Sequence, residues 1–233
     1  MYATYFKRPL DFMVSAVALI LLSPILLLLI VIGAIVLKGN PFFFQPRPGK
    51  MDKSGQERIF YLVKFRTMSN AVDENGNLLP DEQRLGRYGT FLRSTSLDEL
   101  PSLWNILKGE LSLVGPRPQL VRDMTFMTPE QRQRHTVRPG LTGWAQVNGR
   151  NNITWEQKFL YDLEYINGGI TFLGDIRILL TTVGRVLHRS DTVREGTVSD
   201  IDYGDWLLQE GRVSDTDYHQ KQAMAKELLK VGK

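Results

Sequence analysis

The chain has 233 residues, a formal net charge of +4 and no cysteine. This length allows one membrane segment and one domain of ordinary size, and the lack of cysteine excludes disulfide bonds and cysteine-ligated metal sites. Residues 1–150 carry 19 Lys and Arg against 12 Asp and Glu, whereas residues 151–233 carry 10 against 13. A basic first part favours anionic lipid headgroups or phosphorylated substrates, and no basic run or recognition motif supports nucleic-acid binding.

The first predicted element is an apolar helix. No charged residue occurs in Phe12–Leu37, a run of 26 residues that would extend roughly 39 Å as a helix, against about 30 Å for a hydrocarbon core. Ser23 and Pro24 divide this run. Pro24 cannot donate its N–H and crowds the Ile20 carbonyl, which predicts a bend there, and the Ser23 hydroxyl can reach back to the carbonyl of Leu19 or Ile20.

The composition of residues 1–38 leaves three interpretations. A signal peptide fits poorly, because the apolar run is too long and no small-residue cleavage site follows it. Each half of a broken helix would extend about 20 Å, past the bilayer midplane but not across the bilayer. Basic residues flank the run on both sides, so the positive-inside rule gives no direction. A kinked spanning helix and a re-entrant hairpin therefore fit equally well.

The elements after the apolar run are short. Residues 39–68 predict short strands and turns, with the strongest strand character at 59–65, and the polar, turn-rich stretch 69–86 predicts a mobile loop. Residues 138–150 are rich in glycine turns. Helical periodicity predicts helices at 96–110, where Gly109 marks the end, and at 129–136, 155–166 and 170–189. The apolar stripe of the last helix suits either a core or a membrane interface.

Asp98 and Glu99 are adjacent carboxylates at the predicted start of the helix over 96–110. Ser96 followed by Glu99 also fits a capping box, in which both side chains only satisfy free backbone N–H groups. From these residues alone the capping box is the favoured interpretation. The alternative is that the carboxylates hold a metal ion or attack a phosphorus atom at a helix start.

Six basic residues favour the second interpretation, in which the carboxylates hold a metal ion or attack phosphorus, because each of the six lies beside a predicted strand or in a segment stiffened by Pro or Gly. They are Lys64, Arg66, Arg93, Arg117, Arg138 and Arg150. Together they predict a pocket for a polyanion, and a carboxylate pair facing such cations suits phosphoryl transfer through a metal ion.

Two further sequences, Asp200-x-Asp202 and Asp215-x-Asp217, resemble the D-x-D metal motif of nucleotide-sugar glycosyltransferases. They lie in an acidic, polar tail that lacks the surrounding α/β pattern of those enzymes, so a catalytic metal site there is disfavoured.

Taken together, the motifs resemble the bacterial sugar transferase family, the monotopic phosphoglycosyl transferases that start glycan assembly on a polyprenyl phosphate. The resemblance covers roughly residues 5–190. It rests on KRPLDF, the Ser-Pro apolar segment, FFFQPRPGK, KFRTM, SLDELPSLWNILKGELSLVGPRP and RPGLTGWAQVNGRN. Because the chain starts directly at KRPLDF, it looks like the small form of the family.

The resemblance implies an α+β, mostly helical fold. A re-entrant membrane helix-break-helix would occupy residues 1–38, and a compact membrane-associated catalytic domain with short strands and interfacial helices would occupy 39–190. The acidic extension over 191–233 has no counterpart in the family. The resemblance also places the protein at the inner membrane as a monotopic protein, with its catalytic domain on the cytoplasmic face, and it favours the hairpin over the spanning helix.

The implied reaction has two steps. Asp98 would attack the β-phosphate of a UDP-sugar and release UMP, and polyprenyl (undecaprenyl) phosphate would then take the sugar phosphate from the carboxylate. Asp98 would hold Mg²⁺ and Glu99 would assist. Lys64, Arg93, Arg117 and Arg150 match phosphate-binding positions of the family, and Asp162 and Asp175 match acidic ones. The expected substrate-binding set is completed by Arg66, Thr67, Pro118 and Arg138.

The implied partners are a UDP-sugar, polyprenyl phosphate and membrane lipids, with no nucleic acid and with a homodimer left open. The sugar is not specified. Two other functions stay open: a membrane-anchored D-x-D glycosyltransferase that releases UDP instead of UMP, and a basic binding module without enzymatic activity.

Overall fold

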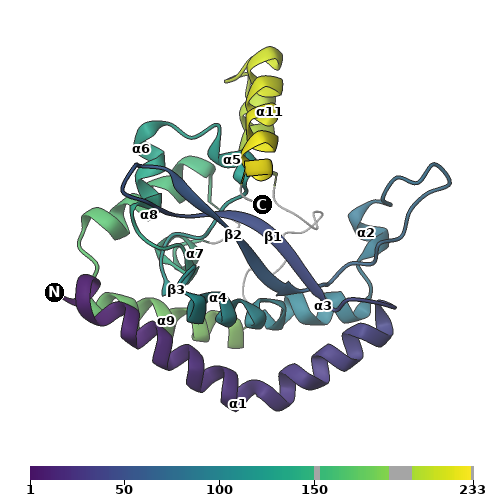
Figure 1. Ribbon diagram of the computed structural model, residues 1–233, viewed down its shortest axis with the longest axis horizontal. Coiled ribbons are helices and arrows are strands. Elements are labelled where there is room, and N and C mark those ends of the chain that lie inside the picture. The colour runs from purple at the N-terminus through teal and green to yellow at the C-terminus, as the bar shows by residue number, and fades with distance from the viewer. Residues whose placement is uncertain (150–152, 189–200, 232–233) are drawn as a thin grey trace.

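The computed structural model describes residues 1–149, 153–188 and 201–231, and this part of the chain is mostly helical, as predicted (Figure 1). The strands are β1 (Phe42–Met51), β2 (Glu57–Phe65), β3 (Ser112–Val114) and β4 (Gly140–Thr142). The first helical elements are η1 (Tyr2–Phe6), α1 (Lys7–Val36), α2 (Asp81–Arg84), α3 (Arg87–Ser94), η2 (Leu97–Ser102), α4 (Leu103–Lys108) and α5 (Val121–Met124). They are followed by α6 (Pro129–Arg132), η3 (Gln133–Thr136), α7 (Trp144–Val147), α8 (Trp155–Asn167), α9 (Phe172–Leu187), α10 (Tyr203–Gln209) and α11 (Asp215–Val231).

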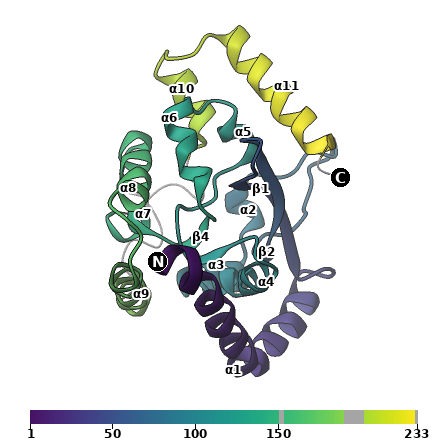
Figure 2. The same ribbon diagram turned by 60° about the vertical axis from the view of Figure 1, so that its left-hand side comes forward.

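The helix α1 is continuous through Ser23 and Pro24, so the bend expected at Pro24 is present, whereas the break of the expected helix-break-helix is not seen. Pro24 lies inside the helix, and the axis bends in its middle, so that both ends of α1 lie on the side of the domain (Figures 1 and 2). The Ser23 hydroxyl donates a hydrogen bond to the Ile20 carbonyl at 2.7 Å, which is one of the two acceptors expected. The proline and this side-chain bond together account for a bend without a break.

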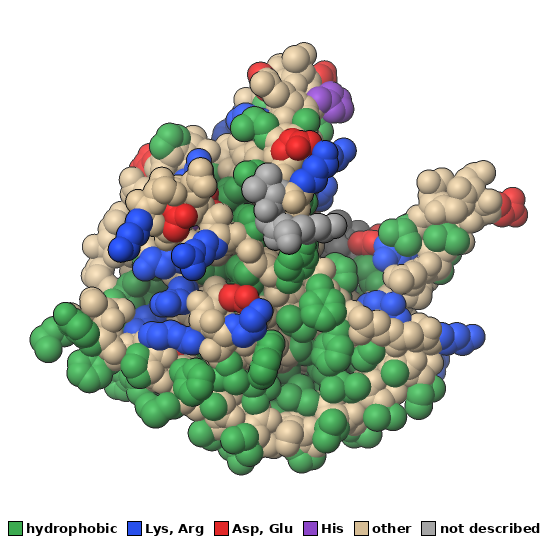
Figure 3. Space-filling view, in the orientation of Figure 1, with side chains coloured by type: hydrophobic (Ala, Val, Ile, Leu, Met, Phe, Trp, Pro, Cys, Tyr) green, Lys and Arg blue, Asp and Glu red, His purple; other side chains and the backbone are tan. Residues whose placement is uncertain are grey.

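One face of α1 packs on the domain and the opposite face is exposed. The first half contributes Leu19 and Leu22 to a core around Ile106, and the second half contributes Leu29 to a core with Phe65. The outer face is covered by hydrophobic side chains, which Figure 3 shows along the whole length of the helix. Among the described residues, Tyr2–Val36 is the one helical stretch long and apolar enough to cross a membrane.

Polar contacts attach the start of α1 to the domain. The Arg8 guanidinium donates to the carbonyl oxygens of Ile106 and Leu107 at 2.5 and 2.8 Å, near the end of α4. The buried Asp11 accepts a hydrogen bond from the Ser112 hydroxyl on β3 at 2.6 Å. Because these partners come from two elements of the domain, the first half of α1 is fixed to the domain by side chains as well as by apolar packing.

The two long strands β1 and β2 form an antiparallel ribbon, with Phe42 opposite Phe65. The strand at 59–65 is confirmed, but the short strands and turns expected before it are wrong, because β1 continues through Pro46 and Pro48. In the described sheet β1 pairs only with β2, so a proline whose missing N–H faces the open edge removes no ladder bond. The ribbon ends at Lys64 and Phe65, beside η2.

The helix predicted over 96–110 forms in two parts, a 3₁₀ turn (η2) and then α4, which ends at Gly109 with φ = 83° as expected. The 3₁₀ turn contains Pro101, whose missing N–H does not suit a regular α-helix. Ser96 adopts φ = 55° and its side chain makes no cap hydrogen bond. The capping-box interpretation is therefore wrong, and the Glu99 side chain is directed elsewhere.

The remaining predicted helices are confirmed with small shifts at their ends: 129–136 forms α6 and η3, 155–166 forms α8, and 170–189 forms α9. Helix α9 buries Ile178 and exposes Leu173 and Leu180, so its apolar stripe is only partly core. In the last described part of the chain, Tyr203 of α10 packs against Trp155 and Phe159 of α8. Figure 2 shows α10 and α11 beside α5.

Candidate active site

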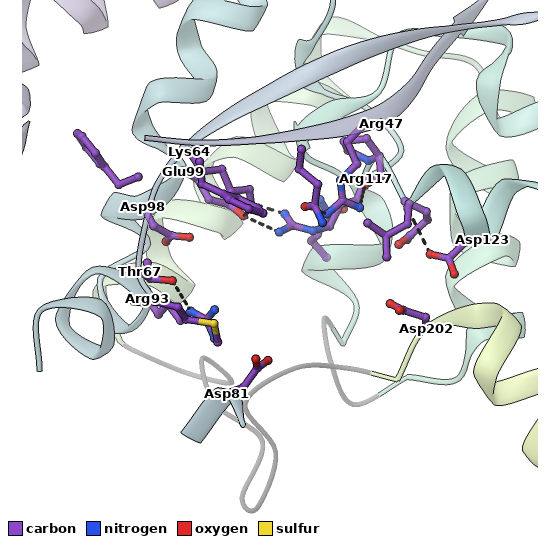
Figure 4. Close-up of a pocket in the computed structure, with 18 of the residues that line it drawn as sticks. Arg47, Lys64, Thr67, Asp81, Arg93, Asp98, Glu99, Arg117, Asp123 and Asp202 are labelled. Carbon is purple, nitrogen blue, oxygen red and sulfur yellow. Dashed lines mark hydrogen bonds and ion pairs between the residues drawn. The ribbon is translucent and has the colours of Figure 1, made fainter. Parts of the chain in front are cut away.

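A cavity of about 600 Å³ lies between the end of β2, the turn η2, the loop after β3, helix α8 and the start of α10 (Figure 4). Nine of the residues expected from the sequence line it, from five separate segments of the chain. They are Lys64, Arg66, Thr67, Arg93, Asp98, Glu99, Arg117, Pro118 and Asp162. The fold therefore collects in one place residues that are up to 98 positions apart in the sequence.

Glu99 is ion-paired on two sides. Its Oε1 accepts from Lys64 Nζ at 2.7 Å and from Arg117 Nη2 at 2.5 Å. Burial alone would raise the Glu99 pKa, but the charges of Arg117 and Lys64 outweigh it and hold the pKa well below its usual range. Glu99 is thus a permanent anion that orients two cations at the cavity.

Asp98 differs from its neighbour. No dashed line reaches Asp98 in Figure 4, and within the described residues no side chain or backbone N–H donates a hydrogen bond to its carboxylate. Burial and the charge of Glu99 raise the Asp98 pKa to about 6, and the charges of Lys64, Arg117 and Arg93 limit the rise. At neutral pH the carboxylate is therefore ionised and its lone pairs are available to a phosphorus atom or a metal ion.

Arg93 is held at the cavity by the close packing of α3. The Arg93 Nε donates to Thr67 Oγ1 at 3.1 Å. A Cβ on Gly89 would lie 1.9 Å from the Thr67 carbonyl oxygen, so only glycine allows α3 to approach the segment after β2 this closely. Arg66, on the same segment, donates to the Leu37 carbonyl at 2.9 Å, beyond the end of α1.

Arg47 is a cation of the site that sequence reasoning missed. Its guanidinium donates to the Pro118 carbonyl at 2.9 Å and to Gln45 Oε1 at 2.6 Å, and it lines the cavity. Burial and the charge of Arg117 lower its pKa to about 10, so Arg47 is still charged at neutral pH. The signal in the sequence was a basic residue between Pro46 and Pro48, next to an apolar run.

Asp162 acts through a second residue that the sequence did not reveal, Arg134. The two are buried and paired, with Arg134 Nε and Nη2 donating to Asp162 Oδ2 at 2.9 and 2.6 Å. The same Nη2 donates to the Arg117 carbonyl at 2.7 Å, which fixes the backbone of the cation that pairs with Glu99. The signal that could have found Arg134 is weak, because it lies in a polar stretch that reads as a surface helix.

Two of the expected residues lie away from this cavity. Arg138 donates to the Gly109 carbonyl at 2.8 Å and lines a different hollow beside Lys108. The Asp175 carboxylate is buried and accepts from Tyr2, Lys7 and Tyr165, so it joins the start of the chain to α8 and α9. Arg150 lies outside the described residues, as does Asp200 of the first D-x-D sequence.

The donors at this cavity fit a metal ion that is shared with a substrate. In the described part of the chain, no three carboxylates or histidines are grouped closely enough to enclose an ion. Mg²⁺ commonly takes only one or two carboxylates, together with phosphate oxygens and water, and the unshared carboxylate of Asp98 suits that role. Asp123 is less suitable, because its two oxygens accept the backbone N–H groups of Leu120 and Tyr203.

Comparison with known proteins decides the family. Residues 2–189 match the family described as bacterial sugar transferase. The chain belongs to the bacterial sugar transferase family. This member is 48% identical over 183 residues to the sugar transferase EpsL of Bacillus subtilis, a match that covers 78% of this chain and 87% of EpsL.

Longer relatives carry names that state a reaction. The match to the UDP-glucose:undecaprenyl-phosphate glucose-1-phosphate transferase of Xanthomonas campestris is 40% identical over 189 residues and covers 76% of this chain but 38% of that protein. The UDP-N-acetylgalactosamine-undecaprenyl-phosphate N-acetylgalactosaminephosphotransferase of Aeromonas hydrophila is 32% identical over 194 residues, with 78% and 44% covered. This family member thus spans less than half the length of these two relatives.

Proposed function

We propose that this sugar transferase moves a sugar-1-phosphate from a UDP-sugar to polyprenyl phosphate and releases UMP. The observation that carries the proposal is the ionised, unshared carboxylate of Asp98 in a cavity whose other side chains include Lys64, Arg93 and Arg117. The names of the Xanthomonas and Aeromonas relatives support the reaction class. Those two names state different sugars, so they leave the sugar of this member open.

In the first step an Asp98 oxygen attacks the β-phosphorus of the UDP-sugar. The bond between that phosphorus and the oxygen bridging the two phosphates breaks, and the electron pair leaves on the α-phosphate as UMP. The sugar phosphate is then an acyl phosphate on Asp98. Arg117, Lys64 and Arg47 would offset the charge of the phosphate oxygens, because their nitrogens are already oriented by Glu99 and Pro118.

In the second step an oxygen of polyprenyl phosphate attacks the same phosphorus. The bond from phosphorus to the Asp98 oxygen breaks, which regenerates the carboxylate and yields a polyprenyl-diphospho-sugar. Glu99 is not the nucleophile in this scheme, because its Oε1 is shared between Lys64 and Arg117. Its role is to hold these cations and to keep the local charge balanced.

Mg²⁺ would be held by Asp98 together with diphosphate oxygens, and it would withdraw charge from the phosphoryl group under attack. The remaining contributions come from the chain itself. Burial and the neighbouring charge of Glu99 keep the Asp98 carboxylate basic, with a pKa near 6, and this increases its nucleophilicity relative to an exposed aspartate.

We further propose that α1 enters the cytoplasmic leaflet of the inner membrane and returns to the same side. Three features support this topology: the bend at Pro24, the exposed apolar outer face, and the two ends on the side of the domain. Leu173 and Leu180 of α9 would extend the apolar surface at the interface. The cavity would then be accessible to a soluble UDP-sugar and to a lipid phosphate.

The identity of the nucleotide product tests the reaction. Purified protein in detergent or vesicles, supplied with Mg²⁺, polyprenyl phosphate and a panel of UDP-sugars, is expected to release UMP from at least one of them. The release should stop when EDTA removes the metal and resume when Mg²⁺ is added back. Release of UDP would instead favour a D-x-D glycosyltransferase, and phosphate binding without any product would favour a binding module.

A further inference from the structure

Asp202 is the second aspartate of the Asp200-x-Asp202 sequence, which the proposed reaction does not use, yet it lies in the wall of the active-site cavity. It occupies the N-cap position of α10, where an aspartate ordinarily accepts a backbone N–H, but its side chain makes no cap hydrogen bond. Its Oδ2 is instead ion-paired with Arg122, and the side chain is 21% exposed. Figure 4 shows the carboxylate directed from the start of α10 towards the cavity.

The backbone around Asp202 is held firmly against the domain. The Tyr203 N–H donates to Asp123 Oδ1 at 2.9 Å, and the Trp155 indole donates to the Ile201 carbonyl at 3.3 Å. The Tyr203 ring is buried against Trp155 and Phe159. Because contacts on both sides fix this short segment, the position of the Asp202 carboxylate is a property of the fold.

The chemistry of the cavity restricts what Asp202 can bind. A carboxylate accepts hydrogen bonds from hydroxyl groups and repels phosphates, so it belongs with a neutral part of the substrate. Figure 4 places Asp202 and Asp98 at opposite ends of the cavity, with Arg47 and Arg117 between them. The diphosphate would therefore occupy the middle of the cavity, and a hydroxyl-bearing group would reach Asp202. That group is either the sugar or the ribose of the UDP-sugar.

We infer that Asp202 accepts hydrogen bonds from the ribose hydroxyl groups of the UDP-sugar. This inference rests on the proposed function. The ribose is preferred over the sugar because displacement at phosphorus is roughly in line, so the UMP half leaves on the side of the β-phosphorus opposite Asp98. With Asp98 and Asp202 at opposite ends of the cavity, that side is the one that Asp202 lines.

The test compares Asp202→Ala with two controls. Arg122→Ala removes the ion pair but keeps the carboxylate, and Asp215→Ala removes the same charge at an exposed position of the second D-x-D sequence, away from the cavity. For each variant the UMP-release assay gives KM and kcat for the preferred UDP-sugar. Inhibition by UMP, which contains the ribose but no transferred sugar, gives a separate binding constant, and a melting curve checks folding.

Asp202→Ala is expected to raise KM for the UDP-sugar about tenfold or more and to weaken inhibition by UMP by a similar factor. Asp215→Ala and Arg122→Ala should stay near wild type, and the order of preference among UDP-sugars should not change. An unchanged KM in Asp202→Ala overturns the inference. A raised KM with an unchanged UMP constant assigns the contact to the sugar and overturns it too. If the wild type releases no UMP, the proposed function fails. Calorimetric titration with UDP-sugars and UMP then still tests the contact without turnover.

Discussion

Asp98 and Glu99 are consecutive residues on one 3₁₀ turn, but only Glu99 is neutralised by ion pairs. Its carboxylate lies 2.7 Å from Lys64 Nζ and 2.5 Å from Arg117 Nη2, whereas Asp98 lies beside this network with its oxygens unshared. The pair therefore separates into one carboxylate with a depressed pKa and one with a raised pKa. Such a split assigns different roles to two neighbouring acids, and it underlies the first three predictions.

Replacing Asp98 by asparagine should abolish UMP release and stabilise the fold. The folded pKa of about 6 exceeds the ordinary value of 3.8, so ionising Asp98 at neutral pH costs at most about 3 kcal/mol of folding free energy, a cost that asparagine avoids. This gain in stability should be present at pH 7.5 and vanish below about pH 4, where the Asp98 carboxyl of the wild type is neutral in both the folded and the unfolded protein. Activity and melting temperature at the two pH values are the measurements. Normal turnover would contradict the mechanism.

The first half-reaction should lose activity in acid. Only the ionised carboxylate attacks phosphorus, so the rate of UMP release should be constant above about pH 7 and about tenfold below its plateau at pH 5. The assay is a single turnover with UDP-sugar and without polyprenyl phosphate, because the acceptor's own phosphate would titrate in the same range. A fall in the rate of UMP release centred near pH 4 would show that the pKa of Asp98 is not raised in the fold.

Replacing Glu99 by glutamine should shift the acidic fall in the rate of UMP release to lower pH. The charge of Glu99 raises the Asp98 pKa. Removing that charge also releases Lys64 and Arg117 from their ion pairs, so that their positive charges lower the Asp98 pKa further. The Glu99 pKa is depressed in the fold, so its stabilising contribution is present above pH 4.5 and is lost in acid. The variant should accordingly melt lower than wild type at pH 7.5. Glu130→Gln, an exposed change of the same kind, should alter neither property.

Arg47 should prove as important for phosphate binding as the cations that the sequence indicated. Arg47→Met keeps the length of the side chain but removes the charge beside the Pro118 carbonyl, so the affinity for UMP should fall about tenfold. Arg58→Met, an exposed change on the neighbouring strand, is the matched control and should bind UMP as wild type does. Equal affinities in the two variants would remove Arg47 from the site.

The topology of α1 can be tested with single cysteines, because the natural chain has none. Thr4→Cys and Gly39→Cys place one thiol before and one after the bent helix. A Cβ at Gly39 has its nearest neighbour at 3.7 Å, so the change is tolerated. Both thiols should react with an impermeant reagent only from the cytoplasmic side. Labelling of Thr4→Cys only from the periplasm would establish a spanning helix.

Much of the fold and the site could be predicted from the sequence, and the failures have physical reasons. Local periodicity and Gly109 were sufficient for the helices, since those signals lie within one element. Pro46 and Pro48 misled the strand prediction, because a proline is tolerated where a strand has an open edge. The capping-box prediction failed because the Glu99 carboxylate is stabilised more by its ion pairs with Lys64 and Arg117, which are distant in the sequence, than by a cap with Ser96. No local pattern reports such partners.

The residues missed at the site share one property, which is that their importance comes from tertiary contacts. Arg134 fixes the backbone of Arg117, and Arg47 donates to the Pro118 carbonyl across 71 positions of sequence. Conversely, Asp175 was expected at the substrate and instead holds Lys7 at 2.5 Å. A carboxylate near a basic motif looks the same in a sequence whether it binds a ligand or connects two helices.

The contacts of Lys7, Arg8 and Asp11 with the domain have a mechanical consequence. They leave no hinge between the bent helix and the elements that carry the cavity, because each side chain bridges directly from the first half of α1 to α9, α4 or β3. The depth to which α1 sinks in a leaflet would therefore set the height of Asp98 above the headgroups. A thinner or thicker membrane would shift the reaction centre as a rigid whole relative to the plane of the lipid phosphates.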